Sequence, residues 1–264
     1  MKQTEVKKQE EETSHAGCFV GFVLLSSQQW DKQQFINDFK ADWGTDLPDE
    51  GGNGEALVFH VDDMMLAVAI MPYPVPYGEA EHYAAANYLW PDAVTAAKTH
   101  QAHVLISVIG QDADLLERGK LFTKAVASCL KQSNATAVYT DGTVFQPDFY
   151  REVAGFMRND DKALPLLDWV WFGVYHTDEQ KGIYTYGLRK FGKEEIEVFA
   201  DADLNDVRDF LLDITSYILE CDVTLQDGET IGFSEEQKLG ITLSDGIALD
   251  GQTLKIEYPY EEND

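Results

Sequence analysis

Three prolines alternate along one short segment and restrict this chain more than any other feature does. Pro72, Pro74 and Pro76 each fix the backbone φ angle, and each lacks a backbone N–H group. Such a segment cannot continue a helix, and it favours an extended polyproline II path that has no internal hydrogen bonds. The sequence therefore predicts a rigid connector, with a strand over 66–71 before it and a helix from about Glu79 after it.

The residues around this connector are rich in side chains that carry chemistry. Glu79 and Glu81 lie at the expected helix start, where carboxylates stabilise exposed N–H groups, and they are also candidate catalytic acid–base groups. A stiff connector would present Tyr73 and Tyr77 as the wall of a preorganised cleft, and Trp90 lies where the helix breaks at a proline. We select these three aromatic residues as candidate binding residues.

Two histidines, His100 and His103, follow at a spacing of three residues. On a continuous helix such a pair lies on one face and can bind a metal, with Glu79, Glu81 or Asp92 as a third ligand. Here the pair spans a helix end and a strand start, so spacing alone does not fix that geometry. In the alternative interpretation, His100 contacts the helix C-terminus and His103 lies in a polar turn. Both are weak catalytic and metal candidates, and no cofactor is predicted.

The hydrophobic pattern predicts an α+β protein with two halves. The first half, 18–158, has the element order β-α-β-β-α-β-α-β, which predicts a ferredoxin-like βαββαβ-type arrangement with additions. Its first helix is expected to open on a capping box formed by Ser26 and Gln29. The expected strands cover 19–25, 56–60, 66–71, 104–109 and 137–140.

The second half, 163–260, follows a polar joint and has a different texture. Three strands over 168–176, 182–189 and 194–199 precede a helix capped by Asp203 or Asn205. Three short strands separated by Asp-Gly turns complete an antiparallel sheet plus a helix. Apolar residues on both faces of its first strands indicate that the two halves pack into one globular unit. Residues 1–17 are polar and predict a disordered tail.

Charge and cysteine content restrict the partners and the compartment. A formal net charge of -27 makes the chain repel DNA, RNA and anionic membranes, and favours a basic protein as partner. The three cysteines include no CxxC pair, which fits a reducing cytoplasm. The chain has no apolar signal region and no run of about 18 apolar residues, so no membrane association is predicted.

Several distributed motifs resemble one known family, the bacterial family catalogued as domain of unknown function 4261. The motifs that carry the resemblance are Met71-Pro72-x-Pro74-Val75-Pro76, Trp90-Pro91-Asp92-Ala93, His100-x-Ala102-His103-Val104, Trp169-x-x-Phe172-Gly173, Tyr184-x-Tyr186-Gly187-Leu188-x-x-Phe191-Gly192 and Leu225-x-Asp227-Gly228-x-Thr230-Ile231-Gly232. The resemblance implies no established activity, cofactor or catalytic residue, so no role is transferred from it.

Three hypotheses for the function follow. The first is a non-catalytic cytoplasmic module that binds a basic protein, for example an immunity-type protein that masks a cationic toxin. The alternative is a hydrolase, metal-dependent or not, with its site near Glu81, His100 and His103. The third is a structural or regulatory module that docks through its tyrosine-rich sheet. The sequence leaves the oligomeric state open.

Overall fold

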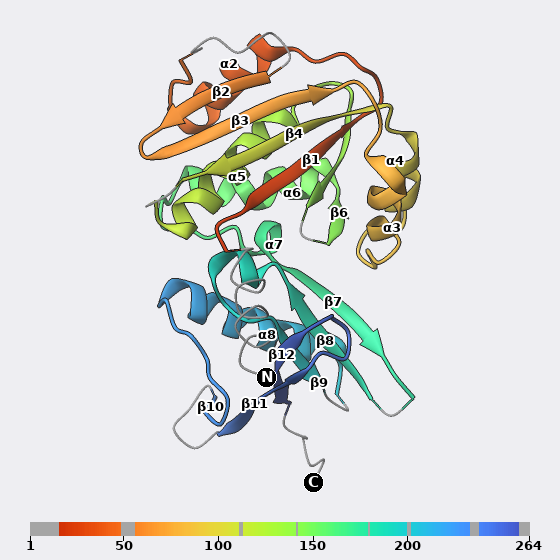
Figure 1. Ribbon diagram of the computed structural model, residues 1–264, viewed down its shortest axis with the longest axis vertical. Helices are drawn as coiled ribbons and strands as arrows, with labels where there is room; N and C mark the ends of the chain where they lie inside the picture. The colour runs from red at the N-terminus through yellow and green to blue at the C-terminus, as the bar shows by residue number, and fades with distance from the viewer. Residues whose placement is uncertain are drawn as a thin grey trace, which may run out of the picture. The chain divides into compact units, whose positions relative to one another are not determined.

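The computed structural model describes residues 16–48, 56–110, 113–140, 142–178, 180–199, 202–232 and 238–258 (Figure 1). The chain divides between Trp169 and Val170 into an N-terminal and a C-terminal unit. Both units combine helices with a sheet, which confirms the predicted α+β class. Residues 1–15 of the predicted tail lie outside the described residues. The predicted fusion of the two halves into one globular unit stays a prediction.

The N-terminal unit contains a six-stranded sheet in the order β2-β3-β4-β1-β5-β6, and each neighbouring pair is antiparallel. A hairpin joins β2 to β3 through Asp62, whose φ angle is 51°, and the strands predicted over 56–60 and 66–71 pair antiparallel. The strands are β1 (Phe19–Leu25), β2 (Ala56–Val61), β3 (Met64–Met71), β4 (Ala102–Ile109), β5 (Ala135–Thr140) and β6 (Thr143–Phe145).

A layer of helices packs against one face of this sheet. α2 (Lys32–Trp43), α5 (Leu115–Cys129) and α6 (Pro147–Ala154) belong to this layer, and Figure 1 shows α5 and α6 behind the strands. Phe35 of α2 packs against Phe59 of β2, with ring centroids 6.3 Å apart. Burying such large apolar rings stabilises each by about 1.5–3 kcal/mol and fixes the layer on the sheet.

The helix boundaries follow from capping side chains. The Asp31 carboxylate accepts a hydrogen bond from the Gln34 N–H at 2.9 Å, so α2 begins after Asp31. The prediction that Ser26 and Gln29 open this helix is wrong, because the Ser26 hydroxyl donates to the Asn134 carbonyl instead. Asp114 caps α5 in the same way as Asp31 caps α2.

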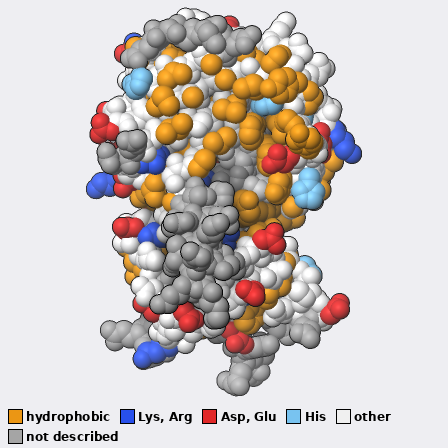
Figure 2. Space-filling model, in the orientation of Figure 1, with side chains coloured by type: hydrophobic (Ala, Val, Ile, Leu, Met, Phe, Trp, Pro, Cys, Tyr) orange, Lys and Arg blue, Asp and Glu red, His pale blue; other side chains and the backbone are white. Residues whose placement is uncertain are grey.

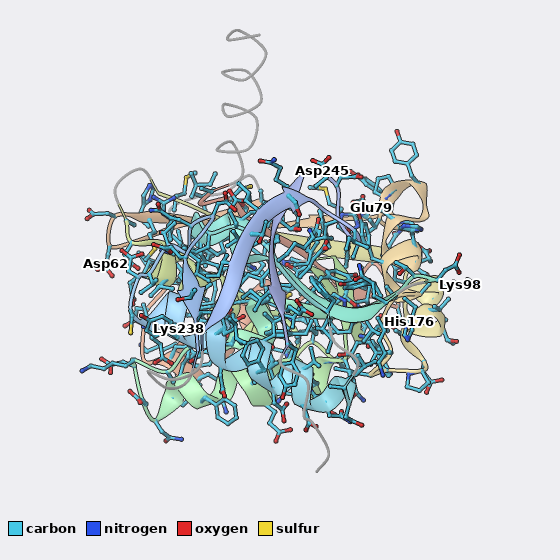
Figure 3. All side chains as sticks on the ribbon, turned by 90° about the horizontal axis from the view of Figure 1, so that it is seen from below. Asp62, Glu79, Lys98, His176, Lys238 and Asp245 are labelled. Atoms are coloured by element: carbon cyan, nitrogen blue, oxygen red, sulfur yellow. The ribbon has the colours of Figure 1, made fainter. Side chains whose placement is uncertain are left out.

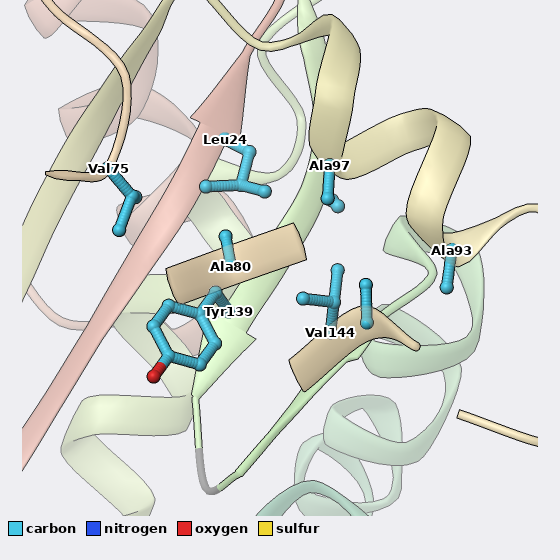
Figure 4. Close-up of a cluster of buried hydrophobic side chains, with 9 residues drawn as sticks. Leu24, Val75, Ala80, Ala93, Ala97, Tyr139 and Val144 are labelled. Atoms are coloured by element: carbon cyan, nitrogen blue, oxygen red, sulfur yellow. The ribbon is translucent and has the colours of Figure 1, made fainter. Parts of the chain in front are cut away.

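Among the described residues of this unit, short helices cover one end of the other face of the sheet. The short helices η2 (Pro76–Gly78), α3 (Glu79–Ala84) and α4 (Ala93–Thr99) lie between β3 and β4 in the chain. Their small side chains pack on β1, β5 and β6, as Figure 4 shows for Ala80, Ala97, Leu24 and Val144. The element order agrees with the predicted β-α-β-β-α-β-α-β series, whereas the ferredoxin-like arrangement itself stays a prediction.

The C-terminal unit has the predicted order of three strands, a helix and three strands. The sheet order is β10-β11-β12-β9-β8-β7, and because β9 pairs with β12 in parallel, the predicted purely antiparallel sheet is wrong. Asp203 caps the helix, and its carboxylate accepts the Asn205 N–H at 2.8 Å. The elements are β7 (Trp171–His176), β8 (Lys181–Tyr186), η4 (Leu188–Phe191), β9 (Ile196–Phe199), α8 (Leu204–Glu220), β10 (Thr230–Ile231), β11 (Leu239–Asp245) and β12 (Gln252–Glu257).

The strand predicted to begin at Asp168 begins at Trp171 instead. Residues Leu166–Trp169 form the short helix α7, preceded by η3 (Gly155–Arg158). Pro165 has a backbone angle that suits a helical start, and its carbonyl accepts the Asp168 N–H at 2.9 Å. The buried Trp169 ring donates to the Thr123 hydroxyl at 2.8 Å and attaches α7 to α5 within the N-terminal unit. No helix of the described residues is long and apolar enough to cross a membrane.

Gly182 in the C-terminal sheet allows its backbone to lie close to the backbone of Val198. Substitution of this glycine tests the close approach. A Cβ atom on Gly182 would lie 2.3 Å from the Val198 carbonyl oxygen, whereas one on Gly240 would meet nothing within 4 Å. We predict that Gly182→Ala lowers the free energy of unfolding by about 1–3 kcal/mol, because backbone atoms must move apart. Gly240→Ala, the matched control, should change it by about 0.5 kcal/mol or less. Equal effects in urea titrations would refute the predicted close approach.

Candidate functional site

The segment of residues 72–76, called here the proline ladder, is held by a buried histidine at the end of α4. The Val75 N–H donates to His100 Nε2 at 2.8 Å, and His100 Nδ1 bonds the Ala97 carbonyl in the last turn of α4. Because Nε2 accepts, the ring proton lies on Nδ1 and points to Ala97. Backbone groups therefore occupy both ring nitrogens, and a metal would have to displace one of them. The arrangement matches the interpretation in which His100 contacts the helix C-terminus.

His103 makes a second attachment to the ladder from the start of β4. Its Nδ1 bonds the Tyr73 carbonyl at 2.9 Å, and the ring packs edge-on against Phe22 and Tyr73 with centroids 5.4 and 5.8 Å away. Burial lowers the pKa of His103 below its usual value; the bond to the Tyr73 carbonyl opposes this, and the neighbouring His100 adds to it. The ring therefore favours the neutral state, in which Nδ1–H donates to Tyr73.

A third attachment completes the path, because the Gln28 amide donates to the Pro72 carbonyl at 2.8 Å. A polyproline segment has no hydrogen bonds of its own, so side chains from neighbouring elements fix its course. The predicted connector is thus present, and the two imidazoles selected as catalytic and metal-binding candidates hold it in place.

Neither candidate carboxylate forms a hydrogen bond or ion pair with His100 or His103. Glu79 Oε1 accepts the Tyr139 hydroxyl at 2.7 Å, and Glu81 has a buried oxygen without a hydrogen bond to any described residue. Neither carboxylate caps α3, whose first turn follows Gly78 without a side-chain bond. Across the described ranges, no group of three or more His, Cys, Asp or Glu side chains is placed to hold a metal ion.

Aromatic rings form a continuous row across this end of the sheet. The row runs from Tyr73 to His103, Phe22, Tyr139 and Tyr83, with successive centroids 5.8, 5.4, 5.7 and 5.5 Å apart. It connects the ladder with strands β4, β1 and β5 and with α3. Phe22 and Tyr139 were missed as site residues because their neighbourhood depends on strand pairing, in which the two lie directly opposite each other.

The three candidate binding residues have different environments. Tyr77 is fully exposed and has a φ angle of 59°, a left-handed conformation that costs a non-glycine residue about 1–3 kcal/mol. Tyr73 is half exposed and belongs to the aromatic row. Trp90 is partly buried and packs against the cluster beneath α3 and α4. Tyr73 of the ladder and Tyr77 of η2 thus face solvent, while Trp90 contributes to packing.

The strands next to the ladder have an outward face that carries no Asp, Glu, Lys or Arg side chain, called here the open sheet face. Its members are Val20 and Phe22 of β1, Ala56, Val58 and His60 of β2, Met65, Ala67, Ala69 and Met71 of β3, and Leu105, Ser107 and Ile109 of β4. All are exposed or half-buried, whereas the alternate residues facing α2 and α5 are mostly buried. Figure 2 shows hydrophobic side chains gathered over these strands.

An antiparallel sheet that faces water on one side normally alternates apolar and polar residues. The open sheet face departs from that pattern, although the chain has 25% charged residues. The apolar character is therefore specific to this face and does not follow from the amino-acid composition of the whole chain.

Residues 184–257 match a family model described as a domain of unknown function (DUF4261). The match lies within the C-terminal unit and confirms the resemblance inferred from its motifs, while the motifs between Met71 and His103 lie outside it. No curated protein and no solved structure matches the chain.

The attachment of the ladder by His100 can be tested by substitution. We predict that His100→Ala lowers the free energy of unfolding by about 2–4 kcal/mol, because it leaves the Val75 N–H unsatisfied and opens a cavity. Hydrogen exchange of the Val75 amide should accelerate by more than the loss of global stability alone would cause. His82→Ala, which removes an exposed imidazole from α3, is the matched control and should leave both quantities nearly unchanged.

The lowered pKa of His103 predicts a pH dependence with a definite sign. The unfolded state binds a proton below about pH 6.5, and the folded state binds it only at lower pH. This contribution to stability is therefore complete above about pH 6.5 and is lost as the pH falls towards the folded pKa. Denaturant titrations of the wild type and His103→Asn should diverge in this window, and a constant difference from pH 5 to 8 would contradict the assignment.

Proposed function

We propose that this chain is a non-catalytic protein-binding module whose open sheet face receives a basic protein. The observation that carries the proposal is the uncharged outward face in a chain with a formal net charge of -27. Val20 and Ile109 on this face are 37% and 52% exposed, and exposed apolar surface of this kind marks interaction sites.

Charge at the edges of the face supports a basic partner. Asp62 and Asp63 are exposed at the β2–β3 turn, and Glu79 and Glu81 begin α3. Figure 3 shows Asp62 and Glu79 on opposite sides of the N-terminal unit. A partner with an apolar centre and surrounding Lys or Arg would match both features. A second copy of the chain would bring two strongly negative charges together, which opposes self-association.

The side chains on and beside the face suit partner binding. Met65 and Met71 are flexible and adapt to the shape of an opposing surface. Tyr73 and Tyr77 extend from a backbone that is already fixed, so little conformational entropy is lost when they become buried. Large aromatic side chains of this kind dominate many protein interfaces.

An immunity-type protein that masks a cationic toxin is the specific version of this proposal. Such a role fits a bacterial cytoplasmic protein and requires no cofactor, and a strongly acidic chain would associate quickly with a basic toxin at low salt. Nucleic acid and anionic membranes are not expected partners, because the charge repels both.

The hydrolase alternative has less support from the site. Both nitrogens of His100 bond backbone groups, and Glu79 bonds Tyr139, so these side chains already have hydrogen-bond partners.

We also propose that β3, β4, β1 and β5 form a ferredoxin-like core. The support is that β4 and β5 flank β1 and are connected by α5, as in a split βαβ unit.

Introducing a charge on the open sheet face tests the proposed function. A basic protein captured at low salt from cells that encode the chain would be identified, purified and titrated calorimetrically against variants. We expect Ile109→Lys to weaken binding by about tenfold, or about 1.4 kcal/mol, and Ile109→Glu to weaken it less. Phe156→Lys is the matched control, since Phe156 is also exposed (59%) but belongs to η3.

Two results would contradict the proposal. One is equal binding by Ile109→Lys and Phe156→Lys, which would place the interface elsewhere. The other is a wild-type dimer that Ile109→Lys dissociates in sedimentation experiments, which would make the face a self-association surface. Thermal unfolding of each variant checks that the fold is retained.

A further inference from the structure

A groove of about 840 Å³ lies in the C-terminal unit between α8 and the segment that leads into β10. Phe210, Ile214 and Tyr217 line it from α8, where a spacing of four and three residues places them on one stripe of the helix. Leu225 and Ile231 line it from the other side. Its volume lies within the range of about 300–1,000 Å³ typical of small-molecule sites.

The chain after α8 turns back to form this groove. The Val223 N–H donates to the Ile218 carbonyl at 3.0 Å, which reverses the chain directly after the helix. The Gly228 N–H then donates to the Ile241 carbonyl at 2.9 Å and attaches the returning segment to the sheet. Both walls are thus fixed by backbone hydrogen bonds, so the groove is formed without a ligand.

The groove combines apolar walls with charge of a single sign. Asp213 and Glu229 are its ionisable lining residues apart from Tyr217, and no Lys or Arg lines it among the described residues. Asp213 is exposed, and its side chain has no hydrogen bond or ion pair with another described residue. One Glu229 oxygen accepts the Gln226 N–H at 2.9 Å, which orients that carboxylate. A ligand with an apolar part and a positive charge would match this groove, because the apolar part fits the walls and the charge fits the two carboxylates.

We propose that this groove binds an amphipathic cation, in which an aromatic or branched apolar group carries an ammonium or guanidinium. The apolar group of the ligand lies between the α8 wall, which includes Tyr217, and the opposite wall, which includes Ile231. The cationic group points towards Asp213 and Glu229. The source is either a free amine or a basic side chain next to an apolar one in a peptide. The site lies within the residues matched by the family model and is independent of the open sheet face.

Methyl NMR of the full-length chain tests this proposal. The probes are phenethylamine, the capped tripeptide acetyl-Phe-Arg-Leu-amide and the neutral isostere 2-phenylethanol, each in about 0.1 M salt to screen distant charges. We expect the cations to shift the methyl resonances of Ile214 and Ile231, while those of Ile183 and Ile196 in the same unit stay unchanged. Tighter binding of the amine indicates a free-amine ligand, and tighter binding of the tripeptide indicates a peptide ligand.

Variants separate this site from general attraction of cations to an acidic chain. Asp213→Asn and Glu229→Gln should each weaken phenethylamine binding by about 2- to 5-fold without affecting 2-phenylethanol. Asp209→Asn removes a charge from the same helix outside the groove and should have no effect. Tyr217→Ala, at a side chain that is 49% exposed and therefore tolerant, should weaken binding of both cations.

Three outcomes would overturn the proposal. They are no saturable shift at Ile214 and Ile231 with either cation, equal affinity for phenethylamine and 2-phenylethanol, and equal weakening by Asp209→Asn and Asp213→Asn.

Discussion

The hydrogen bond from the Val75 amide to the buried His100 ring is the interaction on which the candidate surface of the N-terminal unit depends. A segment with prolines at alternate positions cannot bond to itself or add a strand to the sheet, so its course must be set from outside. His100 supplies that constraint at one end and His103 at the other, each from a residue where α4 passes into β4. The same two bonds place Tyr73 in the aromatic row and leave Tyr77 exposed. Imidazoles whose spacing suggested metal chemistry therefore act in the structure as hydrogen-bonding supports.

Much of this architecture could be predicted from local sequence. Long apolar runs such as Phe19–Leu25 identified the buried strands, and Asp203 or Asn205 marked the start of a helix, because these signals act within one or two turns. The errors arose where a distant or competing partner decided the outcome. Ser26 bonds the Asn134 carbonyl rather than capping a helix, and β12 joins β9 in parallel across a large sequence separation. The sharing of a face by Phe22 and Tyr139 likewise depends on strand register, which periodicity alone does not give.

The two surfaces proposed for binding have one physical property in common. Each places apolar side chains without positive charge next to carboxylates, in a chain whose net charge is strongly negative. On the open sheet face the apolar area is broad and suits a protein, whereas in the α8 groove it is enclosed between two walls and suits a small group. In the two proposals, long-range attraction would draw cations to both surfaces, and the apolar area would determine which cation stays bound.

The tautomer of His100 is the most direct test of this account. Long-range proton–nitrogen NMR at pH 7.5 distinguishes a protonated ring nitrogen from one that accepts a hydrogen bond. We predict that Nδ1 carries the proton, that Nε2 accepts from the Val75 amide, and that neither resonance shifts when zinc is added. A proton on Nε2, or a zinc-dependent shift of that nitrogen, would contradict the structural role and return His100 to the candidates for metal chemistry.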